Sequence, residues 1–333
     1  MTSQKKEKIL GKANPKEIKD FADKLKKIRQ EMARIIVGQE KVTDSFIRAL
    51  ICNGHVLVEG VPGIAKTLII KVLGSVSGCD VKRVQFTVDL LPTDIIGLTI
   101  YRQGDGFEVI KGPIFTNFLI ADEINRSPPK TQSALLEAMQ EKQVTIGRQT
   151  FSIPKPFFVM ATANPIEQSG VYNLPEAQID RFLFKVLMDY TTKEDEKKIL
   201  EKNTDFFSIN DFKLKKIISP SEIIKMQEMV RHIYVSEQIR DYIISLVSAT
   251  RDKKKNYAKY IEWGASPRAT MGLFIAAQAE ALMNGRNFVT PQDVKNVSFD
   301  VLRHRIMLGY EAEAENLSAD GIIKKILEET VVP

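Results

Sequence analysis

The sequence predicts an α/β fold: a parallel sheet flanked by helices and carrying two hairpin inserts, followed by a smaller all-α domain. Short apolar runs alternate with segments of helical spacing over residues 16–191, which is typical of a parallel sheet and its covering helices. These runs contain few polar residues, as expected for strands buried on both faces. From residue 192 to residue 333 the patterns are helical, and residues 1–15 are expected to form a basic flexible tail.

Each strand of the predicted sheet is a short apolar run. The runs are residues 55–58, 81–87, 118–121, 157–161 and 184–188. Apolar residues three or four positions apart follow the first run at residues 68–76 and the third run at residues 135–139. We therefore expect a helix after each of these two strands.

Two stretches depart from the simple alternation of strand and helix. Residues 99–110 and 144–153 are each predicted to form a β-hairpin, because glycines at 104, 106 and 147 supply the turns. Both hairpins are too short to extend the main sheet and are expected to project from it. They either decorate its edge or carry loops that face a substrate.

Signals for helix starts recur in the second domain. Ser219 and Thr290 each precede a proline and stand three residues before a carboxylate, the pattern of a capping box. Ser236 and Ser266 are expected to begin two further helices. Residues 192–195 match a T-K-x-D signature for guanine, but they lie in a charged passage where such a match arises readily by chance, and we favour chance.

Composition excludes several classes of protein. The chain has 333 residues, 44% of them hydrophobic and 27% charged, which is ordinary for a globular protein. Its net charge of +6 is spread along the chain, so we interpret it as a lysine-rich surface that gives only weak support for an acidic partner. The two cysteines and three histidines do not stand at zinc-ligand spacing, and no apolar run approaches the length of a membrane span. We expect a cytoplasmic protein without a structural metal site.

A phosphate-binding loop is predicted between the first strand and the following helix. Its residues are Gly60, Pro62, Gly63, Ile64, Ala65, Lys66, Thr67 and Leu68. Backbone N–H groups and the helix N-terminus would surround the phosphates, Lys66 would bind the outer ones, and Thr67 would bind Mg²⁺. Ala65 replaces the usual glycine before the lysine, which is tolerated because φ is negative at a helix start.

Polar residues also follow two later strands. Asp122 and Glu123 come directly after the run at 118–121, where Asp122 would belong to the Mg²⁺ shell and Glu123 would deprotonate the attacking water. The alternative, an ordinary acidic turn, is disfavoured by the phosphate loop upstream. Asn164 follows the next run along the chain and would orient the water beside Glu123.

Two arginines are candidates for contact with phosphate. Arg181 lies just before the last run, where it either pairs with a neighbouring acid or serves as an arginine finger for the γ-phosphate bound by an adjacent subunit. We expect that it does not reach the phosphates held by its own loop. Arg268 lies in the first turn of a predicted helix, where the helix dipole disfavours a cation, so a phosphate partner is favoured over plain exposure.

Together these motifs resemble the MoxR family of AAA+ ATPases. The matching stretches, which lie within residues 38–315, are GVPGIAKT, GPIFTNFLIADEINRSPPKTQSALLEAMQEKQVTIG, FFVMATANPIEQSGVYNLPEAQIDRFLFK, GASPRA and YEAEAE. In this family the loop carries alanine before its lysine. The resemblance implies that ATP and Mg²⁺ bind here. It assigns Lys66 and Thr67 to the Walker A motif, Asp122 and Glu123 to Walker B, Asn164 to sensor 1, Arg181 to the arginine finger and Arg268 to sensor 2.

The resemblance also has implications beyond the catalytic motifs. It places Val37, Gly38 and Gln39 along the adenine and identifies the two hairpins as the inserts of the helix-2-insert clade. Members of the family usually form hexameric rings and act as chaperone-like remodellers of protein targets. They often work with von Willebrand factor A domain partners that help metal or cofactor insertion.

The sequence disfavours two other functions. A nucleic-acid motor would use the same two hairpins, but the hairpins hold only Arg102, Lys111 and Arg148, which are too few for a groove that follows phosphates. A nucleotide-dependent binding switch with little turnover is disfavoured by the presence of Glu123.

Overall fold

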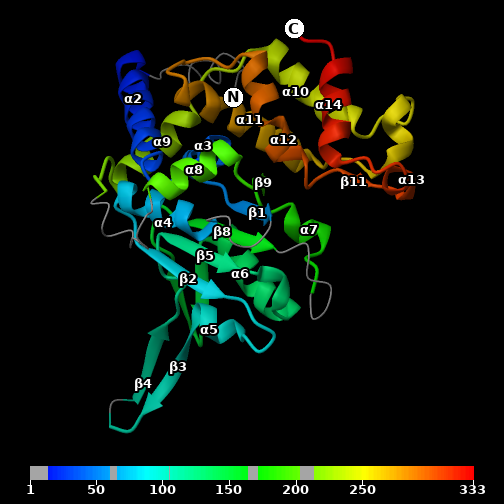
Figure 1. Cartoon of the computed structure of the whole chain (residues 1–333). Coiled ribbons are helices and arrows are strands. Elements are labelled where there is room, and N and C mark those ends of the chain that lie inside the picture. The colour runs from blue at the N-terminus through cyan, green and yellow to red at the C-terminus, as the bar shows by residue number, and fades with distance from the viewer. Residues whose placement is uncertain (1–13, 61–65, 105, 164–171, 203–213) are drawn as a thin grey trace, which may run out of the picture.

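The computed structural model of the protein describes residues 14–60, 66–104, 106–163, 172–202 and 214–333. It confirms the predicted fold class, with a five-stranded parallel sheet, helices on both of its faces and a helical domain beyond it (Figure 1). The strand order is β2-β5-β8-β1-β9. The strands are β1 (Val56–Gly60), β2 (Val81–Gln85), β5 (Phe118–Asp122), β8 (Phe158–Ala163) and β9 (Phe184–Met188). Each coincides with a predicted apolar run.

The central strands are buried on both faces, but the edge strand β2 is not. All five residues of β5 are buried, whereas in β2 only Val84 is buried and Lys82 and Arg83 are exposed. The prediction that all five strands are buried on both faces is therefore wrong for β2. Its partner on one side is β5, and it has no strand on the other, so it meets solvent. At the opposite edge, β9 packs against helix α12 (Pro291–Leu302).

Alternate residues of each central strand enter two different cores. Phe118 and Ile120 belong to a large cluster that continues through the helical domain, whereas Leu119 and Ala121 face a smaller cluster beneath helix α6 (Pro129–Glu141). The large cluster runs without a break from the first helix to the last. The helical domain therefore shares its hydrophobic core with one face of the sheet.

The helices of the first part of the chain lie around the sheet (Figure 1). They are α2 (Pro15–Met32), α3 (Glu40–Ile51), α4 (Lys66–Ser77), α5 (Pro92–Ile96), the 3-10 turn η1 (Ile124–Arg126), α6 (Pro129–Glu141) and α7 (Glu176–Ile179). The apolar side of α2, which repeats every three or four residues, packs against α4 and against α11 of the helical domain. The first described helix therefore ties the two parts of the chain together.

The helical domain contains a small two-stranded antiparallel sheet, formed by its strands β10 and β11. The elements of the helical domain are α8 (Lys193–Lys202), α9 (Pro220–Val230), α10 (Glu237–Ala249), η3 (Asn256–Tyr260), β10 (Ile261–Trp263), α11 (Pro267–Met283), α12 (Pro291–Leu302), β11 (Met307–Leu308), α13 (Tyr310–Ala314) and α14 (Ala319–Glu329).

Across the described ranges, no helix combines the length and the apolar character that a membrane span requires.

The predicted helix starts are confirmed. Ser219 and Thr290 form capping boxes at α9 and α12, and Ser236 and Ser266 accept N-terminal N–H groups of α10 and α11. The T-K-x-D match at residues 192–195 also begins a helix, because the Thr192 hydroxyl accepts the N–H of Asp195 at 3.2 Å. The match is thereby explained as a helix cap.

Both predicted hairpins are present. One is β3 (Gly97–Arg102) with β4 (Gly106–Lys111), and it projects far from the sheet (Figure 1). The other is β6 (Gln143–Ile146) with β7 (Gln149–Ser152). The first carries Tyr101 and Phe107, which are 68% and 79% exposed and whose rings pack edge to face at 5.3 Å.

A buried histidine joins three elements of the sheet domain. Nδ1 of His55 accepts the N–H of Val159 at 3.1 Å, so Nε2 carries the hydrogen and donates it to the carbonyl oxygen of Met139 at 3.2 Å. Burial lowers the pKa of His55 to about 4. The neutral ring thus connects the start of β1 to β8 and to the end of α6.

This histidine makes stability depend on pH. Between pH 6.5 and pH 4 the unfolded chain binds a proton at residue 55 that the folded chain does not, so the free energy of unfolding falls as the pH falls. From pH 7.5 to pH 5 the loss due to His55 amounts to about 2 kcal/mol. We expect His55→Gln to lose about 2 kcal/mol less than wild type over this interval, measured by urea denaturation. Parallel pH profiles of the two proteins would contradict this assignment.

Candidate functional site

Three parallel strands end side by side at one edge of the sheet. Val58 of β1 lies beside Thr162 of β8, and Ala121 of β5 lies beside Ala161 of β8. The residues that follow β1 and β5 therefore meet at the carboxyl edge, where α/β proteins bind their ligands. This edge brings together Lys66, Asp122 and Glu123.

The predicted phosphate loop connects β1 to α4. Gly60 ends β1, and Lys66, Thr67 and Leu68 form the first turn of α4. The Nζ group of Lys66 donates a hydrogen bond to the carbonyl oxygen of Gly60. Burial lowers the pKa of Lys66, while the negative charges of Asp122, Glu59 and Glu123 oppose this shift. Pro62, Gly63, Ile64 and Ala65 lie outside the described residues.

Asp122 is held on both of its carboxylate oxygens. Oδ1 accepts the Thr162 hydroxyl at 2.9 Å, and Oδ2 accepts Nε of Arg83 at 2.7 Å. The Thr162 oxygen also accepts the backbone N–H of Glu123 at 2.9 Å, so one hydroxyl positions both acidic residues. Neither Thr162 nor Arg83 was predicted as a site residue, because their roles depend on the strand order β2-β5-β8.

Glu123 has an uncommon backbone conformation. Its φ of +55° lies in the left-handed region, which few residues other than glycine adopt and which is concentrated at functional sites. Its Oε2 accepts Nη1 of Arg126 at 2.9 Å, so the carboxylate has a fixed direction. Asn164, the predicted partner of Glu123, lies outside the described residues.

The segment predicted to lie along the adenine reaches the same edge. Gln39 Nε2 donates to the carbonyl oxygen of Asp189 at 3.1 Å, and Asp189 follows β9, whose Met188 pairs with Gly60. Val37 and Gly38 directly precede Gln39 in the chain. Gly38 has a φ of +72°, and a Cβ there would lie 2.7 Å from Oδ2 of Asp195. A larger residue at position 38 would therefore push against the start of α8.

The candidate ligands fit a magnesium ion. Thr67 offers a hydroxyl and Asp122 a carboxylate, which are the oxygen donors that Mg²⁺ prefers. Within the described part of the chain, no group of three or more His, Cys, Asp or Glu side chains could hold a metal by itself. Since Mg²⁺ usually takes one or two protein ligands together with phosphate oxygens and water, this donor set is consistent with Mg²⁺ bound to a nucleotide.

Arg181 lies at the edge of the sheet formed by the amino ends of the strands, opposite the carboxyl edge. Val56 of β1 pairs with Phe184, and the N–H of Leu183 donates to the carbonyl oxygen of His55 at 2.9 Å, so Arg181 lies near the start of β1. The loop that begins at Gly60 lies at the other end of this strand, roughly 16 Å farther along at about 3.3 Å per residue. The structure therefore does not bring Arg181 and Lys66 of one chain together.

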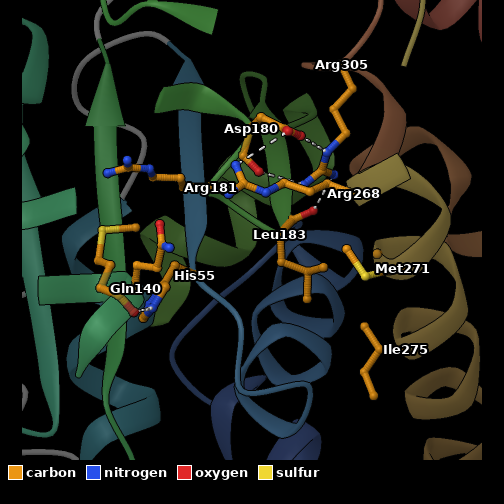
Figure 2. A pocket seen from close by; sticks show the side chains of 11 residues that line it. His55, Gln140, Asp180, Arg181, Leu183, Arg268, Met271, Ile275 and Arg305 are labelled. Atoms are coloured by element: carbon orange, nitrogen blue, oxygen red, sulfur yellow. Dashed lines mark hydrogen bonds and ion pairs between the residues drawn. The ribbon is translucent and has the colours of Figure 1, made fainter. Parts of the chain in front are cut away.

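Arg268 lies with Arg181 and not with Lys66. Its Nη1 is 3.7 Å from Oδ2 of Asp180, and its side chain remains 46% exposed. Arg181, Arg268 and the buried Arg305 line one cavity of about 340 Å³ that also reaches His55. Figure 2 shows Arg268 and Arg305 converging on Asp180, while Arg181 extends away from them. Arg305 was not predicted as a site residue.

The chain is similar to known proteins along most of its length. The profile of the AAA family (ATPase family associated with various cellular activities) matches residues 55–184, and that of the AAA lid domain matches residues 254–326. The chain is 46% identical to Chaperone MoxR1 of Mycobacterium tuberculosis over 91% of this chain and 81% of that protein. It is 41% identical to protein YeaC of Bacillus subtilis over 94% and 96%. A crystal structure of a Cytophaga hutchinsonii protein superposes with a TM-score of 0.86 at 44% identity, covering 94% and 96% of the two chains.

A substitution at Lys66 tests the predicted phosphate loop. Lys66→Ala removes the cation at the start of α4, so we expect the affinity for ATP to fall at least about tenfold, in line with the 1.5–3 kcal/mol of a charge-assisted hydrogen bond. Isothermal titration calorimetry measures this change. Lys71→Ala, an exposed lysine on the same helix, is the matched control and should bind ATP like wild type. Equal affinities of the two variants would rule out the loop.

Proposed function

Because the chain belongs to the MoxR family of AAA+ ATPases, and therefore hydrolyses ATP as a chaperone-like protein, we propose that each catalytic site is shared by two neighbouring subunits of a ring. The observation that carries this proposal is the separation of Arg181 and Arg268 from Lys66. The two arginines lie at one edge of the sheet and the phosphate loop at the other. A neighbouring subunit that places its arginine edge against this loop would complete the site.

One subunit would supply the groups that bind ATP and activate water. Lys66 would bind the outer phosphates, and Val37, Gly38 and Gln39 would lie along the adenine. Thr67 and Asp122 would hold Mg²⁺, which when bound withdraws negative charge from the phosphates. The carboxylate of Glu123 would accept a proton from the attacking water, and Asn164 would orient that water.

The neighbouring subunit would supply the positive charge that the reaction needs. Arg181 and Arg268 would face the γ-phosphate and stabilise the negative charge of the transition state. Arg181 points away from the Asp180 cluster, and Arg268 is nearly half exposed (Figure 2). This arrangement leaves both guanidinium groups accessible to a neighbour. It also revises the role expected of Arg268, which would contact the neighbour's nucleotide.

Such an arrangement requires head-to-tail contacts between subunits. Each subunit offers two different edges to its neighbours, and contacts of this head-to-tail kind close into a ring when the rotation between subunits closes. We propose a hexameric ring, which is the assembly implied by the family resemblance. The two free cysteines, Cys52 and Cys79, support a reducing compartment such as the cytoplasm.

The target of the ring is proposed to be a protein. Hairpin β3–β4 exposes the aromatic pair Tyr101 and Phe107, which suits an apolar polypeptide better than a phosphate backbone. Of the hairpin cations, Arg102 pairs with Glu108 at 3.1 Å, and the Lys111 ammonium lies 4.9 Å from the centre of the Phe151 ring. These cations are engaged within the protein, which argues against the nucleic-acid motor. A von Willebrand factor A domain partner and a role in metal or cofactor insertion are proposed from the family resemblance.

Mixed rings test the shared site. Arg181→Ala subunits should bind ATP normally but hydrolyse it at least about a thousandfold more slowly, as loss of an arginine finger does in GTPases. Adding Lys66→Ala subunits, which have a defective loop and an intact arginine edge, should restore part of the activity. Steady-state phosphate release measures both effects.

The matched control combines two variants that are defective at the same edge. A mixture of Arg181→Ala with Arg268→Ala subunits should stay inactive, because every interface lacks one arginine. No rescue by Lys66→Ala would show that each site lies within one subunit, whereas rescue in the control would show that Arg181 and Arg268 serve the nucleotides of different subunits.

A further inference from the structure

Three consecutive residues after α12 form hydrogen bonds with the chain around Arg181. Arg303 Nη1 donates to the carbonyl oxygen of Lys185 at 2.5 Å, and His304 Nε2 donates to that of Phe182 at 2.9 Å. Arg305 binds the same segment from Asp180 to Leu183. These contacts connect the helical domain directly to the residues on both sides of Arg181.

Arg305 uses every hydrogen-bond donor that it has. Nε donates to Oδ1 of Asp180 at 2.6 Å. Nη1 donates to the carbonyl oxygens of Leu183 at 3.1 Å and Val301 at 2.5 Å. Nη2 donates to those of Asp180 at 3.1 Å and Phe182 at 2.7 Å. The guanidinium has five N–H groups, so all of them are satisfied in a fixed planar arrangement.

Asp180 connects Arg305 to Arg268. Its Oδ1 binds Arg305, while its Oδ2 accepts the Ser266 hydroxyl at 3.2 Å and lies 3.7 Å from Nη1 of Arg268. Ser266 caps the helix that carries Arg268. One carboxylate thus connects the segment of Arg181 to the start of α11, and a buried arginine fixes that carboxylate.

We propose that Arg305 is a positioning residue for hydrolysis: by holding the backbone from Asp180 to Leu183 and the Asp180 carboxylate, it orients Arg181 and Arg268 toward the neighbouring subunit's ATP. This inference rests on the shared site proposed above. Arg305 itself does not touch the nucleotide. Its side chain is only 4% exposed, and its donors are all engaged within the chain.

Lysine cannot replace arginine in this role. An ammonium group has three donors on a flexible stem, whereas the guanidinium presents five in a rigid plane. Arg305→Lys keeps the positive charge near Asp180 but supplies fewer donors to the carbonyl groups of residues 180–183, where Phe182 still accepts from His304. The segment would shift, and a displacement of about 1 Å at catalytic groups can reduce a rate about a hundredfold.

Arg305→Lys should therefore slow hydrolysis without weakening the binding of ATP. We expect the turnover number to fall at least about tenfold and the dissociation constant for ATP to stay within about twofold of wild type, since the variant's own loop is intact. The decisive readout is complementation in mixed rings. Lys66→Ala subunits should rescue Arg305→Lys, and Arg181→Ala subunits should not.

Arg48→Lys is the matched control. Arg48 is another buried arginine that joins the sheet domain to the helical domain, through Nη2 at 2.7 Å from Oε2 of Glu280, but it does not touch residues 180–185. It should lower the melting temperature without reducing turnover more than about twofold below that temperature. An Arg305→Lys protein that loses no more activity than Arg48→Lys would show that Arg305 only stabilises the fold and would overturn the inference.

The rescue pattern separates the remaining outcomes. Rescue of Arg305→Lys by Arg181→Ala but not by Lys66→Ala would mean that Arg305 serves its own subunit's loop, which also overturns the inference. Should the pair Arg181→Ala and Lys66→Ala itself show no rescue, the shared site fails and the inference falls with it. When that pair is rescued and Arg305→Lys is rescued by neither partner, only the role of Arg305 is wrong.

A second variant covers the case in which Arg305→Lys does not fold. Asp180→Asn retains the shape of the side chain and the four carbonyl acceptors of Arg305, but it removes the charge shared by Arg305 and Arg268. We expect the same rescue by Lys66→Ala subunits. Wild-type turnover of Asp180→Asn would contradict the proposal.

Discussion

The parallel pairing of β1 with β9 sets the geometry on which the rest of the molecule depends. Because the two strands run in the same direction, the loop after β1 and the chain before β9 must lie at opposite edges of the sheet. Gly60 and Lys66, which flank the predicted phosphate loop, are at one edge and Arg181 is at the other. The helical domain shares its core with the sheet and joins Arg268 to the same Asp180 that Arg305 holds, so both arginines belong to the edge that faces away from the loop.

The sequence predicts what is local along the chain. Asp122 and Glu123 are recognised because they follow a run of apolar residues, and Ser219 and Thr290 because a cap needs only the next three residues. Thr162, Arg83 and Arg305 escape notice for the opposite reason. Thr162 and Arg83 act on Asp122 only because β8 and β2 are the two neighbours of β5, and this strand order does not follow the order of the chain. In the sequence, nothing distinguishes Arg305 from an arginine on the surface. The fold buries it against a segment more than a hundred residues away in the chain.

Burial changes the meaning of the same residue types elsewhere in the fold. The run at β2 is expected to be covered, yet its position at the edge of the sheet exposes Lys82 and places Arg83 where it can reach Asp122. The hairpin cations are already too few in the sequence for a groove that follows phosphates, and the structure pairs Arg102 with Glu108. In each case the sequence identifies the residue type, and the tertiary contact decides its function.

The proposed mechanism depends on a shared site, in which Arg181 and Arg268 serve the nucleotide of a neighbouring subunit. Its most direct test is a structure of the assembled Glu123→Gln protein with ATP, since loss of the carboxylate base should trap the bound nucleotide. We predict that both guanidinium groups lie within hydrogen-bonding distance, about 3 Å, of the γ-phosphate bound by Lys66 of the next subunit. Contact of either arginine with the nucleotide held by its own loop would contradict this account.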